Sequence, residues 1–157
     1  MPSPHIDLFS VFDQAFAGRA WHGTPLWGTL RGLDAAAALR RPAPGRHNIW
    51  ELVLHCAYWK FVVRQRVTGD AALTFPRAGT NFPELPAAAD DAEWKRDRML
   101  LKREHELLRE AIAGCTPAML RRRVGNKRFN AAETVVGIAS HDLYHAGQIQ
   151  LIRRLVG

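Results

Sequence analysis

The sequence predicts an all-α protein with the architecture of a four-helix bundle. Apolar residues recur at three- and four-residue steps in four long segments, as on one face of an α-helix. No run shows the sustained alternation of apolar and polar residues that indicates a half-buried strand. Four amphipathic helices bury their apolar faces by packing together, and a chain of 157 residues is of ordinary domain size. We therefore predict a single domain over residues 1–157.

The first helix is predicted over residues 6–20, followed by a short second piece. Its apolar stripe consists of Ile6, Phe9, Phe12, Phe16 and Ala20. Thr24 is a suitable N-cap with Pro25 at the first helical position, and this second piece continues through Leu30. Asp34 is placed to cap the short alanine-rich turn that follows it.

The second long helix is predicted to begin after Asn48 and to end at about Thr68. Asn48 and Glu51 have the spacing of a capping box, in which each side chain bonds the other residue's backbone N–H. Gly69 is a typical residue for ending a helix. Residues 69–89 are rich in Pro, Gly and Ala, and they are too many for an ordinary connection. We expect this segment to cross the bundle or to shape a site.

The third long helix is predicted to open at Asp90 or Asp91 and to end at Gly114. Both aspartates can accept hydrogen bonds from the unpaired N–H groups of a first turn. Thr116, followed by proline, is predicted to start a further short helical turn.

The last helix carries two histidines. Asn130 and Glu133 form a second predicted capping box, and the helix is expected to run to about Leu155. His141 and His145 are four residues apart, so their Cβ atoms lie about 5–6 Å apart on one helix face. One metal ion can join two imidazoles at that separation through bonds of about 2.0–2.1 Å.

A third histidine strengthens the prediction of a metal site. His55 falls within an apolar helix face, where an unpaired imidazole carries a desolvation cost that a metal would relieve. The other residues of that face are Leu52, Trp59 and Val62. The spacing of His141 and His145 also matches the helical HExxH motif, but Asp142 stands where that motif has glutamate. This substitution argues against a metalloprotease. Asp142 would either orient a ligand imidazole through a hydrogen bond or lie in solvent as an ordinary helix charge.

Composition and charge restrict the classes of function. With 47% apolar and 24% charged residues, the chain is of the ordinary globular type. No apolar run approaches the roughly 20 residues that span a membrane. The beginning of the chain has neither the basic start nor the apolar stretch of a signal peptide, so we expect a cytoplasmic protein. Cys56 and Cys115 form no CxxC pair and are interpreted as small buried apolar residues, with a disulfide or reactive thiol as the alternative.

The net charge of +7 raises the question of an anionic partner. Basic residues are concentrated in one segment, Arg121–Arg123 with Lys127 and Arg128. We interpret it as a solvated loop, and the alternative is a site for a phosphate-bearing ligand or nucleic acid. Because no zinc-finger spacing, RNP-like motif or basic zipper is present, we do not expect nucleic-acid binding.

Three stretches together resemble the DinB-like (YfiT-like) family, which is unrelated to the DNA polymerase that shares the name. They are Trp21-His-Gly-Thr-Pro, Arg46-His-Asn-Ile-Trp-Glu-Leu-Val-Leu-His55 and His141-Asp-Leu-Tyr-His145-Ala-Gly-Gln-Ile. The resemblance covers nearly the whole chain. It implies an up-down-down-up four-helix bundle with a divalent metal held by three histidines, one on the second long helix and two on the fourth. In this chain those ligands would be His55, His141 and His145.

The resemblance and the open coordination of a three-histidine site imply an enzyme. Three protein ligands leave a position for substrate, as in catalytic metal sites. We expect a metal-dependent hydrolase or a thiol-dependent transferase acting on a small molecule, with a low-molecular-weight thiol as a candidate partner. The metal would be zinc or nickel, or else iron or manganese. The alternative is a non-catalytic metal-binding stress-response protein.

Two further expectations concern Gln148 and assembly. Gln148 lies seven and three residues after the two histidines, on the same helix face. We interpret Gln148 as the candidate catalytic residue. The alternative interpretation is that it is an ordinary polar residue at the edge of the bundle. The resemblance also implies a homodimer. The aromatic residues of the first helix and its extension favour one, because they exceed what one face of a small bundle needs: Phe9, Phe12, Phe16, Trp21 and Trp27.

Overall fold

The computed structural model describes residues 7–157, and it is helical over most of them. Ile6, the predicted start of the first helix, lies outside the described residues. The elements, in chain order, are α1 (Leu8–Phe16), η1 (Leu26–Leu30), α2 (Ala35–Leu39), α3 (Ile49–Thr68), α4 (Asp91–Ala113), α5 (Pro117–Arg121), β1 (Arg123–Val124), β2 (Phe129–Asn130) and α6 (Ala131–Val156). The predicted all-α fold class is confirmed.

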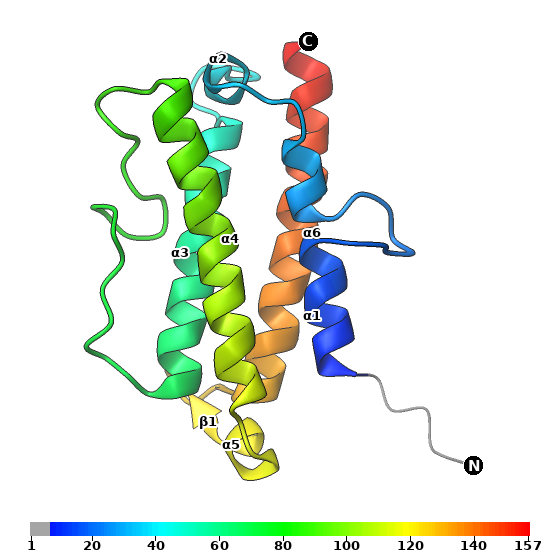
Figure 1. Ribbon diagram of the computed structural model, residues 1–157, viewed down its shortest axis with the longest axis vertical. Coiled ribbons are helices and arrows are strands. Elements are labelled where there is room, and N and C mark those ends of the chain that lie inside the picture. Colours follow the sequence, from blue (N-terminus) through cyan, green and yellow to red (C-terminus); the bar gives the residue numbers. More distant parts are fainter. Residues whose placement is uncertain (1–6) are drawn as a thin grey trace.

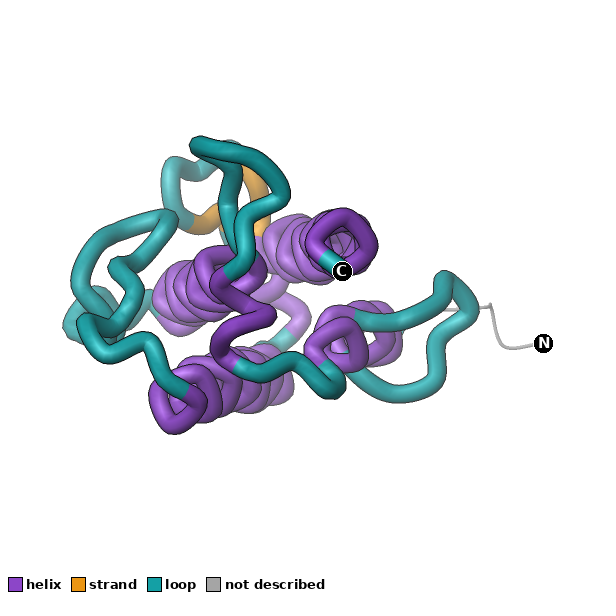
Figure 2. Tube along the Cα trace, turned by 90° about the horizontal axis from the view of Figure 1, so that it is seen from above, coloured by secondary structure: helices purple, strands orange, loops and turns teal. Residues whose placement is uncertain are grey.

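Three long helices and one interrupted helix make the bundle. In Figure 1, α1 and α6 run toward the end that carries the C-terminus, whereas α3 and α4 run the opposite way. The short helix η1 continues the column of α1 alongside α6 (Figure 1). Viewed along the bundle in Figure 2, the four columns stand side by side, and the loop between α3 and α4 lies outside them. No helix among residues 7–157 is long and apolar enough to cross a membrane.

The helix ends follow the local sequence. Asn48 and Glu51 form a capping box at the start of α3, and Asn130 and Glu133 form another at the start of α6. Gly69 ends α3 in the left-handed conformation, with φ of 75°, which suits a residue without Cβ. The predicted caps Asp34, Asp90 and Thr116 each accept a backbone N–H of their helix.

The first predicted helix is shorter than expected. It ends at Phe16 because Gly18 turns the chain with φ of 90°. The following piece is a 3-10 helix whose N-cap is Pro25, and not the α-helical turn capped by Thr24 that we predicted. The expected aromatic surface is also smaller, because Phe12 and Phe16 are buried in the core. Trp21, in the loop between α1 and η1, is 98% exposed.

A small hairpin was not predicted. Arg123 pairs with Asn130 and Val124 with Phe129 in an antiparallel ladder just before α6. The arginines of this segment hold local structure: Arg122 donates to the carbonyl of Val67, and Arg123 donates to that of Arg128. The exposed basic segment therefore begins at the last residue of α5 and continues as loop and hairpin, and these two arginines have structural partners.

Buried polar residues separate two hydrophobic clusters along the bundle. One cluster includes Trp50, Trp94 and Ile149, and the other includes Leu108 and Val135. On each long helix, polar side chains fall between the residues of the two clusters. Those between the clusters are Lys60, Glu104, His105, Asp142 and His145, whereas the buried His55 lies within the α3 part of the first cluster. The three histidines of interest belong to this polar layer or border it.

Candidate metal site

The fold brings His55, His141 and His145 together between α3 and α6. The Nε2 atom of His141 lies 3.0 Å from Nε2 of His55 and 3.0 Å from Nε2 of His145. His55 and His145 are 6% exposed, and His141 is half-buried. These three residues form a group with the geometry to hold one metal ion.

Hydrogen bonds at the outer nitrogens orient two of the three rings. The Nδ1 atom of His55 donates to the backbone carbonyl of Asn81 at 2.7 Å. The Nδ1 atom of His145 donates to Oε1 of Gln148 at 2.6 Å. Since a neutral imidazole carries one proton, both rings direct the lone pair of Nε2 toward the site. Such outer hydrogen bonds usually accompany histidine ligands of metals.

The three nitrogens fit a cation better than they fit one another. His141 can donate one Nε2 proton at most, yet its Nε2 faces two nitrogens that each present a lone pair. At least one close pair of acceptors then remains unsatisfied. A divalent cation accepts all three lone pairs, and imidazole ligands suit zinc, copper, iron and nickel.

The environment keeps the three imidazoles neutral. Burial lowers the pKa of His55 to about 4 and that of His141 to about 3. Burial also lowers the pKa of His145, against the opposing effect of the bond to Gln148. The neighbouring imidazoles contribute further to the shifts of His55 and His141. Neutral rings at physiological pH are the form that binds metal.

The loop between α3 and α4 forms one wall of the site. Asn81 has φ of 63°, in the left-handed region, and its Oδ1 accepts a hydrogen bond from Trp59 Nε1 at 2.8 Å. The next residue, Phe82, stacks on the ring of His55 with centroids 4.2 Å apart. Of the two expectations for this long segment, the structure agrees with the second, since Asn81 and Phe82 contact a histidine of the candidate site. The length of the segment alone could not identify these two residues.

A buried polar network lies behind the site. Asp142 is fully buried, which rules out the alternative of a solvated helix charge. Its Oδ2 accepts from Lys60 Nζ at 2.5 Å, so its partner is Lys60 and not a ligand imidazole. Lys60 also lies 3.3 Å from Nδ1 of His105, whose ring stacks against Phe12 and Phe16. Lys60 was not identified from the sequence as a buried residue. Its position among aromatic residues, between Tyr58 and Phe61, could have indicated burial.

Cys56 lies next to this network but has the character of a buried thiol. One ligand atom each from Cys56, His141 and Asp142 fall within 4.8 Å of one another. Burial raises the pKa of the Cys56 thiol well above its ordinary value, and the charge of Asp142 adds to this. The protonated thiol is a poor metal ligand. Cys56 is buried, as predicted, whereas Cys115 is only partly so, and both are free thiols.

Two clefts lined by residues of α3 and α6 open onto the histidines. The hairpin cleft, about 280 Å³ in volume, reaches His141 and is lined by Trp59, Arg66, Phe129 and Glu133 among others. The α3–α6 cleft, about 460 Å³, leads from Arg46 past Phe82 to His145 and Gln148. Volumes of this order suit small molecules.

Fold and site together define a class of protein, a helical bundle with a candidate three-histidine metal centre reached by open clefts. The model of the DinB superfamily matches residues 20–149, which include all three histidines. The chain therefore belongs to the DinB superfamily. No curated protein and no solved structure matches it.

Proposed function

We propose that this protein is a metal-dependent enzyme that acts on a small molecule as a hydrolase or as a thiol-dependent transferase. The observation that carries the proposal is the convergence of three neutral Nε2 atoms at a point that two clefts reach. Three protein ligands are typical of catalytic metal sites, because they leave room for the reacting group.

Each residue of the site has a defined part in the proposed chemistry. His55, His141 and His145 would hold zinc or nickel, or else iron or manganese. The metal, when bound, supplies Lewis acidity and lowers the pKa of a coordinated water or thiol. Asn81 and Gln148 keep two ligand rings oriented through their outer nitrogens. Because the histidines are engaged as ligands, they do not act as general bases.

A direct assay tests this proposal. The metal-free protein is loaded with zinc, nickel or manganese and offered an electrophilic substrate together with one of several small thiols. We expect turnover that requires metal and thiol, disappears with a chelator and is absent in His55→Ala. His22→Ala is the matched control, because His22 is exposed and, among residues 7–157, hydrogen-bonds only the carbonyl of Gln14.

The outcomes separate the candidate functions. Turnover that needs metal but no thiol identifies a hydrolase. Absence of turnover with every thiol and ester, in protein shown to be fully metallated, favours the alternative of a non-catalytic metal-binding stress-response protein.

A further inference from the structure

The structure points to a substrate class for the candidate metal site. We propose that the α3–α6 cleft binds a small carboxylate with an apolar body, with its carboxylate on Arg46 and its body against Phe82 and Tyr144. This inference rests on the proposed function for the reaction itself, but the binding it describes can be measured without metal.

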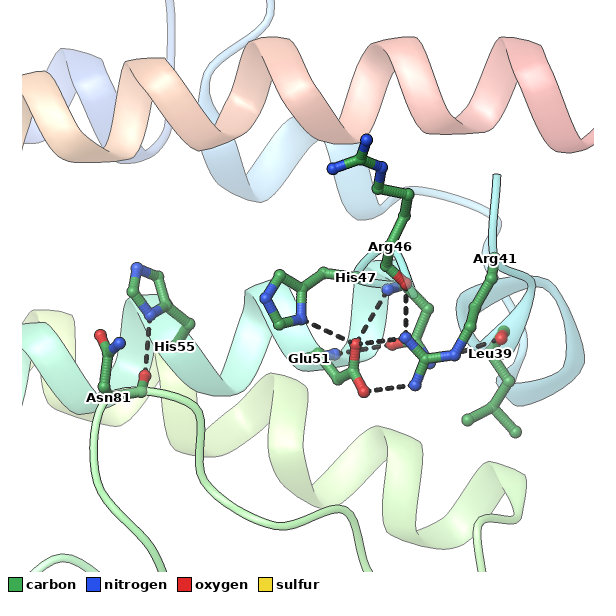
Figure 3. Close-up of polar contacts among 8 residues, drawn as sticks. Leu39, Arg41, Arg46, His47, Glu51, His55 and Asn81 are labelled. Carbon is green, nitrogen blue, oxygen red and sulfur yellow. Dashed lines mark hydrogen bonds and ion pairs between the residues drawn. The ribbon is translucent and has the colours of Figure 1, made fainter. Parts of the chain in front are cut away.

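Arg46 lies at the end of the cleft away from the histidines. Figure 3 shows its guanidinium extending toward α6, whereas the side chains of Arg41 and His47 converge on Glu51. Within residues 7–157, the guanidinium of Arg46 makes no hydrogen bond or ion pair. An arginine fork of this kind is suited to a planar carboxylate, which it binds through two parallel hydrogen bonds.

Glu51, the nearby acid, is occupied by other groups. It accepts from Arg41 at 2.5 and 2.9 Å, from Nδ1 of His47 at 3.1 Å and from the backbone N–H of Asn48 at 3.0 Å. No acidic residue lines the α3–α6 cleft in the part of the chain described. The hairpin cleft differs, because there Arg66 is accompanied by Glu133. Of the two clefts that reach the histidines, the α3–α6 cleft is therefore the one with an uncompensated positive charge.

Aromatic and aliphatic side chains separate Arg46 from the histidines. Phe82 stacks on His47 with centroids 3.8 Å apart and on His55 at 4.2 Å, so it lines the path between them. Tyr144, which is 66% exposed, and Leu151 line the same cleft from α6. A ligand with an apolar middle and an anionic end matches this order of surfaces, and its other end would lie beside His145 and Gln148.

The test uses 4-phenylbutyrate and, as its uncharged counterpart, 4-phenylbutan-1-ol. Binding of each is measured by calorimetry or NMR titration to the full chain, metal-free and zinc-loaded. We expect the acid to bind more tightly than the alcohol. Arg46→Gln should weaken binding of the acid about tenfold and leave binding of the alcohol unchanged. Arg66→Gln is the matched control, since Arg66 is also an exposed arginine at a cleft reaching the site. It should leave both ligands unaffected.

Three results would overturn the inference. They are equal binding of acid and alcohol, absence of saturable binding of the acid, and weaker binding of the acid in Arg66→Gln but not in Arg46→Gln. The last would place the ligand in the hairpin cleft. Failure of the proposed function is recognised separately, because a protein that binds no zinc but holds the acid through Arg46 loses only the catalytic proposal.

Discussion

Lys60 and Asp142 form an ion pair from which solvent is completely excluded. The Nζ and Oδ2 atoms are 2.5 Å apart, and both side chains are 0% exposed. Lys60 also lies 5.0 Å from the ring centroids of Phe12 and of Phe16. Because Lys60 belongs to α3 and Asp142 follows His141 on α6, the pair ties together the two helices that carry the histidines.

Breaking this pair should destabilise the protein strongly. Asp142→Asn leaves the Lys60 ammonium buried without its counter-charge, and loss of one partner of a buried pair costs about 3–5 kcal/mol. We expect a loss of that size in the free energy of unfolding, measured by urea denaturation of metal-free protein. The exposed pair of Arg109 and Asp13 is the control, and Asp13→Asn should cost less than about 1 kcal/mol.

The double variant Lys60→Met/Asp142→Leu distinguishes the effect of an unpaired buried charge on stability from the effect of altered packing. Replacing a buried ion pair by apolar side chains of similar size is often neutral or stabilising. The double variant should therefore recover most of the stability lost in Asp142→Asn. A double variant that is as unstable as Asp142→Asn would contradict the view that the unpaired ammonium causes the loss.

Metal content should follow the three histidines. Purified protein is expected to carry about one equivalent of divalent metal, measured by elemental analysis, and His141→Ala and His145→Ala should each remove it. The remaining two imidazoles leave too few ligands for a stable site. Far-ultraviolet circular dichroism should confirm that the variants remain helical. Full metal occupancy in both variants would rule out this ligand set.

Local signals in the sequence predicted most of the fold. The capping boxes of Asn48 with Glu51 and of Asn130 with Glu133 depend on residues three apart, so they could be identified without tertiary information. The short 3-10 helix η1 was harder to predict from local signals. Its N-cap is Pro25, and no side chain caps its first turn, so the expected cap by Thr24 does not form.

The candidate site was predictable only in part. His141 and His145 share a helix face by spacing, and His55 was suggested by its apolar surroundings. Asn81 contacts His55 across 26 positions of the chain, and Lys60 contacts Asp142 across 82. Such pairs depend on how α3, α6 and the long loop pack against one another. A local sequence pattern carries no information about that tertiary packing. Asp142 was ambiguous for the same reason, because an aspartate on a helix can be solvated or buried.

Acid should destabilise the protein through His105. Burial lowers the pKa of this imidazole to about 2, and the charges of Lys60 and Arg109 add to the effect. The unfolded chain therefore binds a proton below about pH 6.5 that the folded protein does not, so stability is fully present above that pH and is lost as the pH falls. Between pH 7 and pH 5 this residue alone should account for a loss of up to about 2 kcal/mol.

His105→Gln tests this linkage while keeping an acceptor for Lys60. Urea unfolding in the presence of a chelator should show a smaller loss of stability between pH 7 and pH 5 in the variant than in the wild type. Identical pH dependence in the two proteins would show that His105 is not the group responsible.

We expect the protein to form a homodimer through α6. Large apolar side chains outside the α3–α6 cleft remain exposed along this helix, and they are Val136 and Leu143. A Cβ on Gly147 would have no neighbour within 4 Å among residues 7–157, so another helix can approach closely there. Sedimentation at micromolar concentration should give twice the chain mass of 17.6 kDa. Val136→Glu should shift it toward the monomer, whereas Met99→Glu, on the exposed side of α4, should not. A wild-type monomer would refute the dimer.

The last prediction concerns whether Gln148 acts on the substrate or on a ligand. Its Oε1 accepts the Nδ1 proton of His145 at 2.6 Å, which holds that ring with Nε2 toward His141. Removal of a hydrogen-bond partner of this kind typically costs 10–100-fold in metal affinity. We therefore expect Gln148→Met to weaken zinc binding by about that factor, in competition with a chelator, and Gln148→Glu, which retains an acceptor, to restore most of it. At saturating zinc, Gln148→Met should then keep most of its turnover. If zinc affinity is unchanged and turnover at full occupancy is lost, Gln148 acts directly on the substrate, as the sequence-based hypothesis of a catalytic residue holds.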